Sequence, residues 1–304
     1  MPNWTQEAPI ANIPCPLCSE GVRRRIVDTV WDAPEAAVYQ CTACEIVFVH
    51  PIMTVAEEEA FYAAEFASYM KQRGGAGETR AVEHFQKNSG EATRRLANLR
   101  PYLKPDMHVL EIGSSTGFLL HALAPNVASV TGVEPGQVYA EYANQRGILT
   151  HASLQAVAEQ RFDLILGYYV LEHLRNPIEY LRQLYELLRP GGRLVLEVPN
   201  VEDALVHFYQ LESFDRFYWQ KAHYFNYSHK TLERVLTTAG FQVRMIPEHR
   251  YDISNHIHWL LAGQPGGKGK YCHVFDDALN REYARCLKEQ WLCDTVMAIA
   301  TKSA

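Results

Sequence analysis

The stretch at residues 109–120 constrains the fold most. It joins an apolar segment, through a turn of small residues at Gly113–Gly117, to a second apolar segment. Another apolar run, Val130–Val133, begins 21 residues after Val109 and is followed by Glu134. This order predicts a strand, a turn, a helix and a second strand that ends in a carboxylate. Such a unit suits a nucleoside site, because small residues let the backbone approach a ligand and a carboxylate can accept hydrogen bonds from ribose hydroxyls.

The spacing within the turn argues against two classes of cofactor. It reads Glu111-x-Gly113-x-x-x-Gly117 rather than Gly-x-Gly-x-x-Gly, and it lacks the Gly-Lys-Ser/Thr of a phosphate-binding loop. The first difference disfavours a dinucleotide and an oxidoreductase, and the second disfavours a nucleoside triphosphate. Among nucleoside cofactors, S-adenosylmethionine carries no phosphate, and it fits this turn best.

From residue 107 onward, predicted strands alternate with predicted helices. The strands are expected at 107–112, 129–134, 162–167, 193–198, 241–246 and 294–300. The helices are expected at 117–124, 136–146, 176–189, 229–239 and 276–291. Alternation of this kind predicts an α/β fold with a doubly wound, mostly parallel, Rossmann-like sheet, whose ligands bind at the C-terminal ends of the strands.

The chain of 304 residues is long enough for one large domain and a smaller one. We expect a β-rich unit over 1–53, helices that link the domains and cover the cofactor over 54–105, and the α/β domain over 106–304. Thr54 and Glu57 form a capping-box pattern, which predicts that a helix starts at the beginning of the second part.

Two stretches contain several glycines. Gly74–Gly77 predicts a flexible break between the helix that starts at Thr54 and another helix over 82–103. Residues 263–269 lie within a stretch over 250–291, which we interpret as an insertion or a mobile lid.

Two Cys-x-x-Cys pairs occupy the N-terminal unit, Cys15 with Cys18 and Cys41 with Cys44. Together they supply four thiolates, the ligand set of a closed tetrahedral zinc site. Because no position is left for water, we expect a structural Zn²⁺ that stabilises a unit too small to fold on its own core. Iron is an alternative metal, and a redox role is disfavoured because no βαβ pattern surrounds either pair.

The net charge and the hydropathy of the chain limit its possible partners and its location. A formal net charge of -6 does not support the basic face that binds nucleic acid. No apolar run reaches the roughly 18 residues of a membrane span, and the N-terminus lacks a signal-peptide pattern. A cytoplasmic location is therefore expected, where Cys272, Cys286 and Cys293 should be ordinary buried thiols.

Five motifs occur in the order and spacing of one known family. They are Glu111-x-Gly113-x-x-x-Gly117, Glu134, Phe162–Ile165, Val170–Leu174 and Leu188–Gly192. Through them residues 82–245 resemble class I S-adenosylmethionine-dependent methyltransferases. The cysteine unit, followed by Phe48-x-x-Pro51 and a helix, is similar to the zinc-binding domain that precedes this fold in sugar methyltransferases of bacterial polysaccharide and antibiotic pathways.

The resemblance implies a set of cofactor contacts. The implied residues are Glu111, Gly113, Ser114, Gly117, Glu134, Pro135, Ser153 and Tyr168. Gly113 and Gly117 would line the amino-acid end and the sulfonium, and Glu134 would hold the ribose diol. Tyr168 would face the methionine side. The family often places an acidic residue near the adenine amine, and here Ser153 or the backbone would take its place.

Methylation of a hydroxyl requires a base to remove its proton, and His223 is the candidate. Sugar C-methyltransferases carry Tyr-x-Glu-His in the corresponding region, followed five residues later by a Ser. This chain keeps His223 and Ser228 but has Gln220 and Ala222 in place of the Tyr and the Glu. A lone base favours O-methylation. The alternative interpretation of His223 is a packed or capping histidine.

Polar and aromatic residues that often recognise sugars form two clusters. The acceptor-binding candidates within them are Tyr224, Asn226, Asn255, His256 and His258. The second cluster could instead be an ordinary helix start capped by Ser254 or Asn255. Glu172 and His173 could likewise only fix a local turn.

The sequence therefore predicts a methyltransferase acting on a small hydroxylated acceptor, such as a sugar, a sugar nucleotide or a glycan. Some ribosomal RNA methyltransferases also join a zinc unit to this fold, so RNA is an alternative acceptor. A sugar C-methyltransferase and a non-catalytic binding module are further alternatives, and polyketide or peptide acceptors stay open.

Overall fold

The computed structural model describes residues 10–11, 13–18, 20–65, 69 and 80–303. The predicted glycine break at Gly74–Gly77 lies outside these residues.

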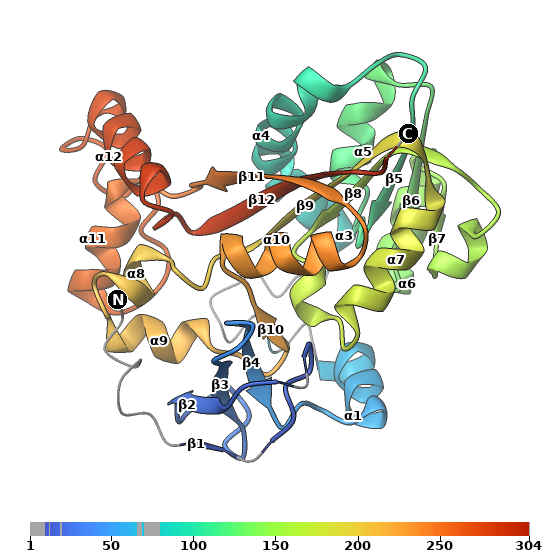
Figure 1. Ribbon diagram of the computed structural model, residues 1–304. Helices are drawn as coiled ribbons and strands as arrows, with labels where there is room; N and C mark the ends of the chain where they lie inside the picture. The colour runs from blue at the N-terminus through green and yellow to red at the C-terminus, as the bar shows by residue number, and fades with distance from the viewer. Residues whose placement is uncertain (1–9, 12, 19, 66–68, 70–79, 304) are drawn as a thin grey trace.

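A seven-stranded sheet forms the centre of the molecule, in the order β11-β12-β9-β8-β5-β6-β7 (Figure 1). Its strands are β5 (His108–Ile112), β6 (Ser129–Val133), β7 (Thr150–His151), β8 (Phe162–Tyr168), β9 (Leu188–Pro199), β11 (Gln242–Glu248) and β12 (Thr295–Thr301). Strands β5 to β9 pair in parallel, whereas β12 pairs antiparallel with both β9 and β11. The predicted doubly wound, mostly parallel sheet is confirmed.

Helices cover both faces of this sheet. They are α3 (Ala81–Lys87), α4 (Ser89–Leu99), α5 (Phe118–Leu123), α6 (Gln137–Gln145), α7 (Pro177–Leu187) and α10 (His229–Thr238). Leu110 and Ile112 of β5 join the core packed under α7 and α10. Val109 joins the core packed under α4 and α5. Because strand side chains alternate between faces, Glu111 lies on the α4 side of the sheet.

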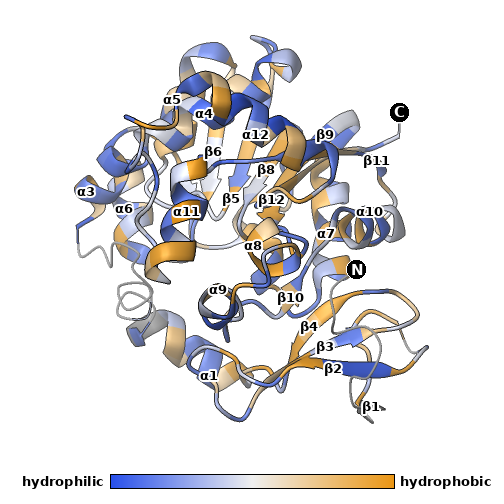
Figure 2. Cartoon of the chain, turned by 90° about the vertical axis from the view of Figure 1, so that its left-hand side faces the viewer, coloured by the Kyte–Doolittle hydropathy of each residue, from blue (hydrophilic) through white to orange (hydrophobic). Residues whose placement is uncertain are grey.

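A smaller antiparallel sheet has the order β1-β2-β3-β4-β10. Its strands are β1 (Ile10–Ala11), β2 (Arg23–Val27), β3 (Ala37–Cys41), β4 (Val47–His50) and β10 (Phe225–Asn226). Figure 2 shows β10, which is far from β4 in the sequence, lying beside it. The cysteine unit and the α/β domain therefore share one sheet.

The helical part departs from its prediction at Asn88. The expected helix over 82–103 is divided into α3 and α4, and a 3₁₀ turn, Arg100–Tyr102, follows α4. Asn88 donates from its side-chain amide to the carbonyl of His84 at 2.8 Å, a local bond that competes with a continuous helix. The capping box at Thr54 is confirmed, and it starts α1 (Val55–Ala60).

Several short elements carried no clear period in the sequence and were not predicted. Besides β7 and β10 they are α8 (Ala204–His207) and α9 (Glu212–Tyr218). The stretch over 250–291 holds two helices, α11 (Ile253–Ala262) and α12 (Asp277–Glu289). Asp252 caps α11 by accepting from the Asn255 N–H, so a cap at Ser254 or Asn255 was wrong. Within the described part of the chain, no helix combines the length and the apolar character needed to span a membrane.

Candidate active site and cysteine centre

The turn after β5 takes a conformation that requires glycine. Gly113 and Gly117 have φ of 63° and 72°, in the left-handed region that favours glycine. A Cβ added to Gly113 would lie 2.6 Å from Val170 Cγ2. The Val170 side chain of the loop after β8 therefore packs directly against the turn, and the two loops lie together at the C-terminal end of the sheet.

Glu134, just after β6, is held by two backbone amides. Its two carboxylate oxygens accept from the N–H groups of Ser115, at 2.8 Å, and Gly136, at 2.7 Å. Burial raises its pKa, and the two amide bonds oppose that shift. Each oxygen keeps a lone pair for a further donor, as binding of a ribose diol requires. The Glu134 N–H also donates to the His151 carbonyl at 2.8 Å, which brings the segment with Ser153 beside it.

Glu111 is buried on the α4 side of β5. Only 2% of the residue is exposed, and burial raises the pKa of its carboxyl to about 8 against the opposing charge of Arg95. The Arg95 guanidinium lies 4.2 Å from the centroid of the Tyr168 ring. Arg95 was not predicted, because only the packing of α4 against the ends of β5 and β8 reveals it.

Four buried polar atoms of α4, β5, the glycine turn and β8 have no hydrogen-bond partner among the described residues. They are Oε2 of Glu111, Oγ of Ser114, the hydroxyl of Tyr168 and Nε of Arg95. Buried polar groups are normally paired, so a set of this kind indicates a polar ligand. Together with Glu134 and the glycine turn, these atoms fit the amino-acid end and the ribose of S-adenosylmethionine.

Of the other predicted cofactor residues, Gly117 is the N-cap of α5, and Pro135 and Ser153 are exposed. Their contacts with a cofactor stay predictions.

His223 lies beside two other titratable side chains. Its ring is 4.9 Å from that of His173, measured between centroids. Nitrogens of both rings and a carboxylate oxygen of Glu172 lie within 4.8 Å of one another. The Gln220 amide nitrogen lies 3.3 Å from Nδ1 of His223. The structure therefore brings His223 together with the loop that packs on Gly113.

Burial sets the charges of this cluster. His173 donates from Nδ1 to the carbonyl of Ala222 at 2.7 Å, and burial lowers its pKa to about 4. Burial raises the pKa of Glu172 to about 8. Both groups are therefore mainly neutral at pH 7, so His223 has no full charge from either neighbour.

The predicted acceptor residues fall into two groups. Tyr224 and Asn226 are buried next to His223, and both amide atoms of Asn226 have no hydrogen-bond partner in the described part. Asn255, His256 and His258 are buried on α11, where His256 Nδ1 lies 2.6 Å from the Tyr283 hydroxyl of α12.

A buried ionic network connects the α11 region to the sheet. Arg250 pairs with Asp294 at 2.6 Å and lies 4.8 Å from the Tyr169 ring centroid, next to Tyr168. The network runs on through His249, whose Nδ1 is 3.2 Å from Asp294 and whose ring lies 5.4 Å from that of His256. The α11 residues are thus connected through this network to the loop after β8. Their role in binding an acceptor stays a prediction, and so does the motion of a lid.

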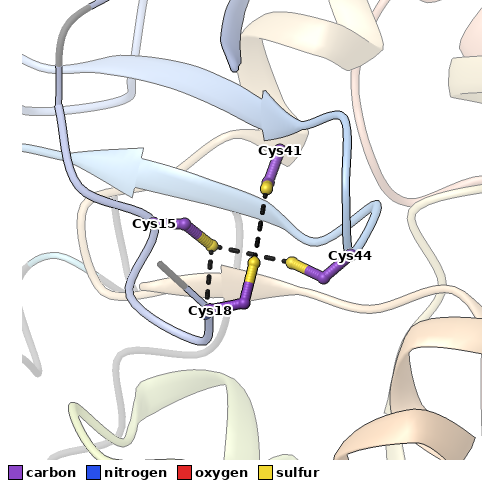
Figure 3. Close-up of side chains that lie close together, drawn as sticks. All are labelled: Cys15, Cys18, Cys41 and Cys44. Carbon is purple, nitrogen blue, oxygen red and sulfur yellow. Dashed lines mark hydrogen bonds between the residues drawn. The ribbon is translucent and has the colours of Figure 1, made fainter. Parts of the chain in front are cut away.

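The four predicted metal ligands come together at one end of the small sheet (Figure 3). Sγ of Cys15 lies 3.6 Å from that of Cys44, and Sγ of Cys18 lies 3.7 Å from that of Cys41. Sulfurs at the corners of a tetrahedron around zinc, each about 2.3 Å from the ion, lie about 3.8 Å apart. The sulfur positions therefore fit a tetrahedral ion. Of the remaining thiols, Cys293 is buried as expected, whereas Cys272 is exposed and Cys286 is partly exposed.

Comparisons with known proteins agree with this geometry. A family model described as a methyltransferase domain matches residues 83–245, more than half of the chain. A ubiquinone biosynthesis O-methyltransferase of Ruegeria pomeroyi is 32% identical over 121 residues, which are 37% of this chain and 48% of that protein. A tRNA U34 carboxymethyltransferase of Idiomarina loihiensis is 34% identical over 107 residues, which are 31% of this chain and 33% of that protein. The chain thus matches half or less of the length of these relatives.

Among solved structures, an S-adenosylmethionine-dependent methyltransferase of Archaeoglobus fulgidus superposes with a TM-score of 0.50 at 18% identity. The superposition covers 78% of this chain and 100% of that one. The chain therefore belongs to the methyltransferase-domain family, and it has the class I, S-adenosylmethionine-dependent methyltransferase fold.

Proposed function

We propose that this protein transfers the methyl group of S-adenosylmethionine to a hydroxyl of a small acceptor, most specifically a sugar, sugar nucleotide or glycan end. His223 is the general base in this proposal, and the four cysteines hold a structural Zn²⁺. The observation that carries it is that His223 lies against His173 and Glu172. These two residues belong to the loop after β8, which packs against the glycine turn.

S-adenosylmethionine brings an already activated methyl group, so the protein has to align the acceptor and remove its proton. Imidazole suits the second task, because its unperturbed pKa is about 6.5. A neutral imidazole has one ring nitrogen that accepts a proton, and the partner at the other nitrogen decides which one does so. The Gln220 side chain, whose oxygen accepts from the Tyr69 hydroxyl at 3.1 Å, lies 3.3 Å from Nδ1 of His223. The neutral state of His173 helps, because a charged neighbour would oppose protonation of His223.

Binding of the cofactor is assigned to the residues around the turn. Glu134 accepts from the ribose hydroxyls through the lone pairs that Ser115 and Gly136 leave unused. Arg95 offers the planar, permanently charged donor that suits the cofactor's carboxylate. Glu111 and Ser114 supply polar groups for its amino end, at the place where their own atoms have no protein partner.

Oxygen as the methylated atom is supported by the replacement of two residues that accompany the histidine in sugar C-methyltransferases, here Gln220 and Ala222. The name of the Ruegeria relative likewise describes an O-methyltransferase. The Idiomarina relative makes transfer RNA a second candidate acceptor. The net charge of -6 disfavours it, because binding to phosphate backbones requires a basic surface.

The test uses S-adenosylmethionine with a labelled methyl group, offered with a panel of sugar nucleotides, a quinol and total transfer RNA. The proteins compared are the wild type, His223→Ala and the control His273→Ala, which changes an exposed histidine. Label in a sugar fraction that only His223→Ala loses, by about 100-fold or more, is the expected result. Label confined to RNA or quinol would replace the acceptor class, and full turnover by His223→Ala would exclude it as the base.

A further inference from the structure

We propose that the cysteine unit acts as a clamp: it holds in place the segment 219–226, which forms the acceptor side of the active site. Through the strand pairing of β4 with β10 and the contacts of Trp31, its metal-bound fold holds residues 219–226 and thereby positions His223. The cofactor half lies on β5 and β6 and does not depend on this clamp. The inference rests on the proposed function in taking His223 as the base and the four cysteines as a metal site.

The first contact between the cysteine unit and this segment, which we call the first grip, is a strand pairing. β10 adds to the small sheet by pairing antiparallel with β4, with Phe225 opposite Phe48 and Asn226 opposite Val47. One residue earlier, the carbonyl of Tyr224 accepts from the Val49 N–H at 3.1 Å. His223 is the next residue toward the N-terminus, so its backbone position follows from the position of β4.

The second grip lies on the other side of His223. The Trp31 N–H donates to the Trp219 carbonyl at 2.8 Å, and the Trp31 carbonyl accepts from the Lys221 N–H at 3.3 Å. The ammonium group of Lys221 pairs with Asp32 at 2.7 Å, and its side chain is only 15% exposed. The segment that carries His223 is therefore bound at both ends by backbone of the cysteine unit.

The cysteines control the hairpin that makes the first grip. Cys41 is the last residue of β3, and Cys44 stands in the turn that leads to β4. The Cys41 N–H donates to the Ile46 carbonyl at 3.0 Å, which closes that turn. The buried sulfurs pack in the same hydrophobic core as Phe48, Tyr224, Phe225 and Tyr227. A metal that ties these cysteines together thus also fixes the surface on which β10 lies.

Loss of the metal should therefore act beyond the unit itself. A unit of about 50 residues buries too little apolar area to hold its fold without a staple. When its hairpin loosens, β10 loses its partner strand and His223 loses its position. The core under α7 and α10 is continuous with the cysteine core. Gly113 and Glu134, however, belong to loops of the large sheet, which has its own strand pairing and a second core under α4 and α5. The affinity for the cofactor should therefore not change when the metal is lost.

Hydrogen–deuterium exchange on the full chain tests the clamp without any acceptor. Zinc-loaded protein is compared with protein treated with a chelator, and with chelated protein given zinc again. Peptides within 219–227 should exchange on the order of tenfold faster without metal and recover with it, while peptides within 108–134 stay unchanged. The affinity for S-adenosylmethionine, measured by calorimetry, should change by less than about twofold.

Two variants extend the test. Cys44→Ser should reproduce the chelated state, whereas Cys272→Ser, at an exposed cysteine, should leave exchange unchanged. Lys221→Met keeps the metal and removes the ion pairs with Asp32 and Glu65, so exchange should rise within 219–227 while 36–50 stays protected. The proposal is overturned if loss of metal speeds exchange over 15–50 while 219–227 stays protected, or if cofactor binding is lost together with the metal. Neither result depends on which acceptor is methylated.

Discussion

The guanidinium of Arg95 stacks on the ring of Tyr168, 4.2 Å from its centroid, and joins α4 to the end of β8. Arg95 is 7% exposed, and its charge opposes the rise in the pKa of Glu111. Nε of Arg95 lies 3.9 Å from Oε2 of Glu91 but makes no hydrogen bond with the described residues, so this buried cation can still donate to an anion. The carboxylate of the cofactor is the anion that the proposed function supplies.

Arg95→Met is therefore expected to weaken binding of S-adenosylmethionine. A hydrogen bond to a charged group contributes about 1.5–3 kcal/mol, which corresponds to roughly 10- to 150-fold in the dissociation constant. Calorimetry with the purified protein measures this change. Arg100→Met removes an exposed arginine from the turn after α4 and serves as the control. Equal affinities for the two variants would remove Arg95 from the cofactor site.

Glu134→Ala should also weaken cofactor binding, because it removes the proposed acceptor of the ribose hydroxyls. The loss should be about tenfold or more. The variant also frees the N–H groups of Ser115 and Gly136, so the thermal midpoint of unfolding has to be measured beside the affinity. Adenosine, which keeps the ribose, should lose affinity in parallel with the full cofactor. Unchanged affinity in a folded variant would contradict the ribose assignment.

These two residues differ in how far the sequence could reveal them. Glu134 stands a fixed distance after the glycine turn, and its role follows from local order along the chain. The metal site could be predicted equally well, because the spacing of the cysteine pairs alone indicates a tetrahedral site. Arg95 and β10 acquire their meaning only from partners far along the chain, Tyr168 for the first and β4 for the second. A strand of two residues has no period, so its pairing could not be predicted.

The raised pKa of Glu111 predicts how stability depends on pH. Burial raises the pKa of this carboxyl to about 8, well above the value of about 4.3 in an unfolded chain. Between these two values the folded state holds a proton that the unfolded state has released, so stability falls as pH rises from about 4.3 to 8. Glu111→Gln should remove this part of the dependence.

Thermal unfolding from pH 5 to pH 9 measures the effect. Relative to the wild type, Glu111→Gln should gain stability as pH rises, by an amount on the order of a few kcal/mol at pH 9. Glu159→Gln, at an exposed site, is the control. A constant difference between Glu111→Gln and the wild type across the pH range would mean that Glu111 has an ordinary pKa.

Gly113 and Gly147 offer a matched pair for the close approach at the cofactor turn. Both have positive φ, 63° and 81°, but an added Cβ at Gly113 would lie 2.6 Å from Val170 Cγ2, whereas at Gly147 it would meet nothing within 4 Å. Gly147→Ala should lose only the backbone term, about 1–2 kcal/mol of unfolding free energy. Gly113→Ala should lose more and should also weaken cofactor binding. Adding Val170→Ala to Gly113→Ala should recover part of the lost unfolding free energy, because it removes the methyl group that clashes with the new Cβ. If the two glycine variants were equally stable and bound the cofactor equally well, the loop after β8 would not pack on the turn as the structure has it.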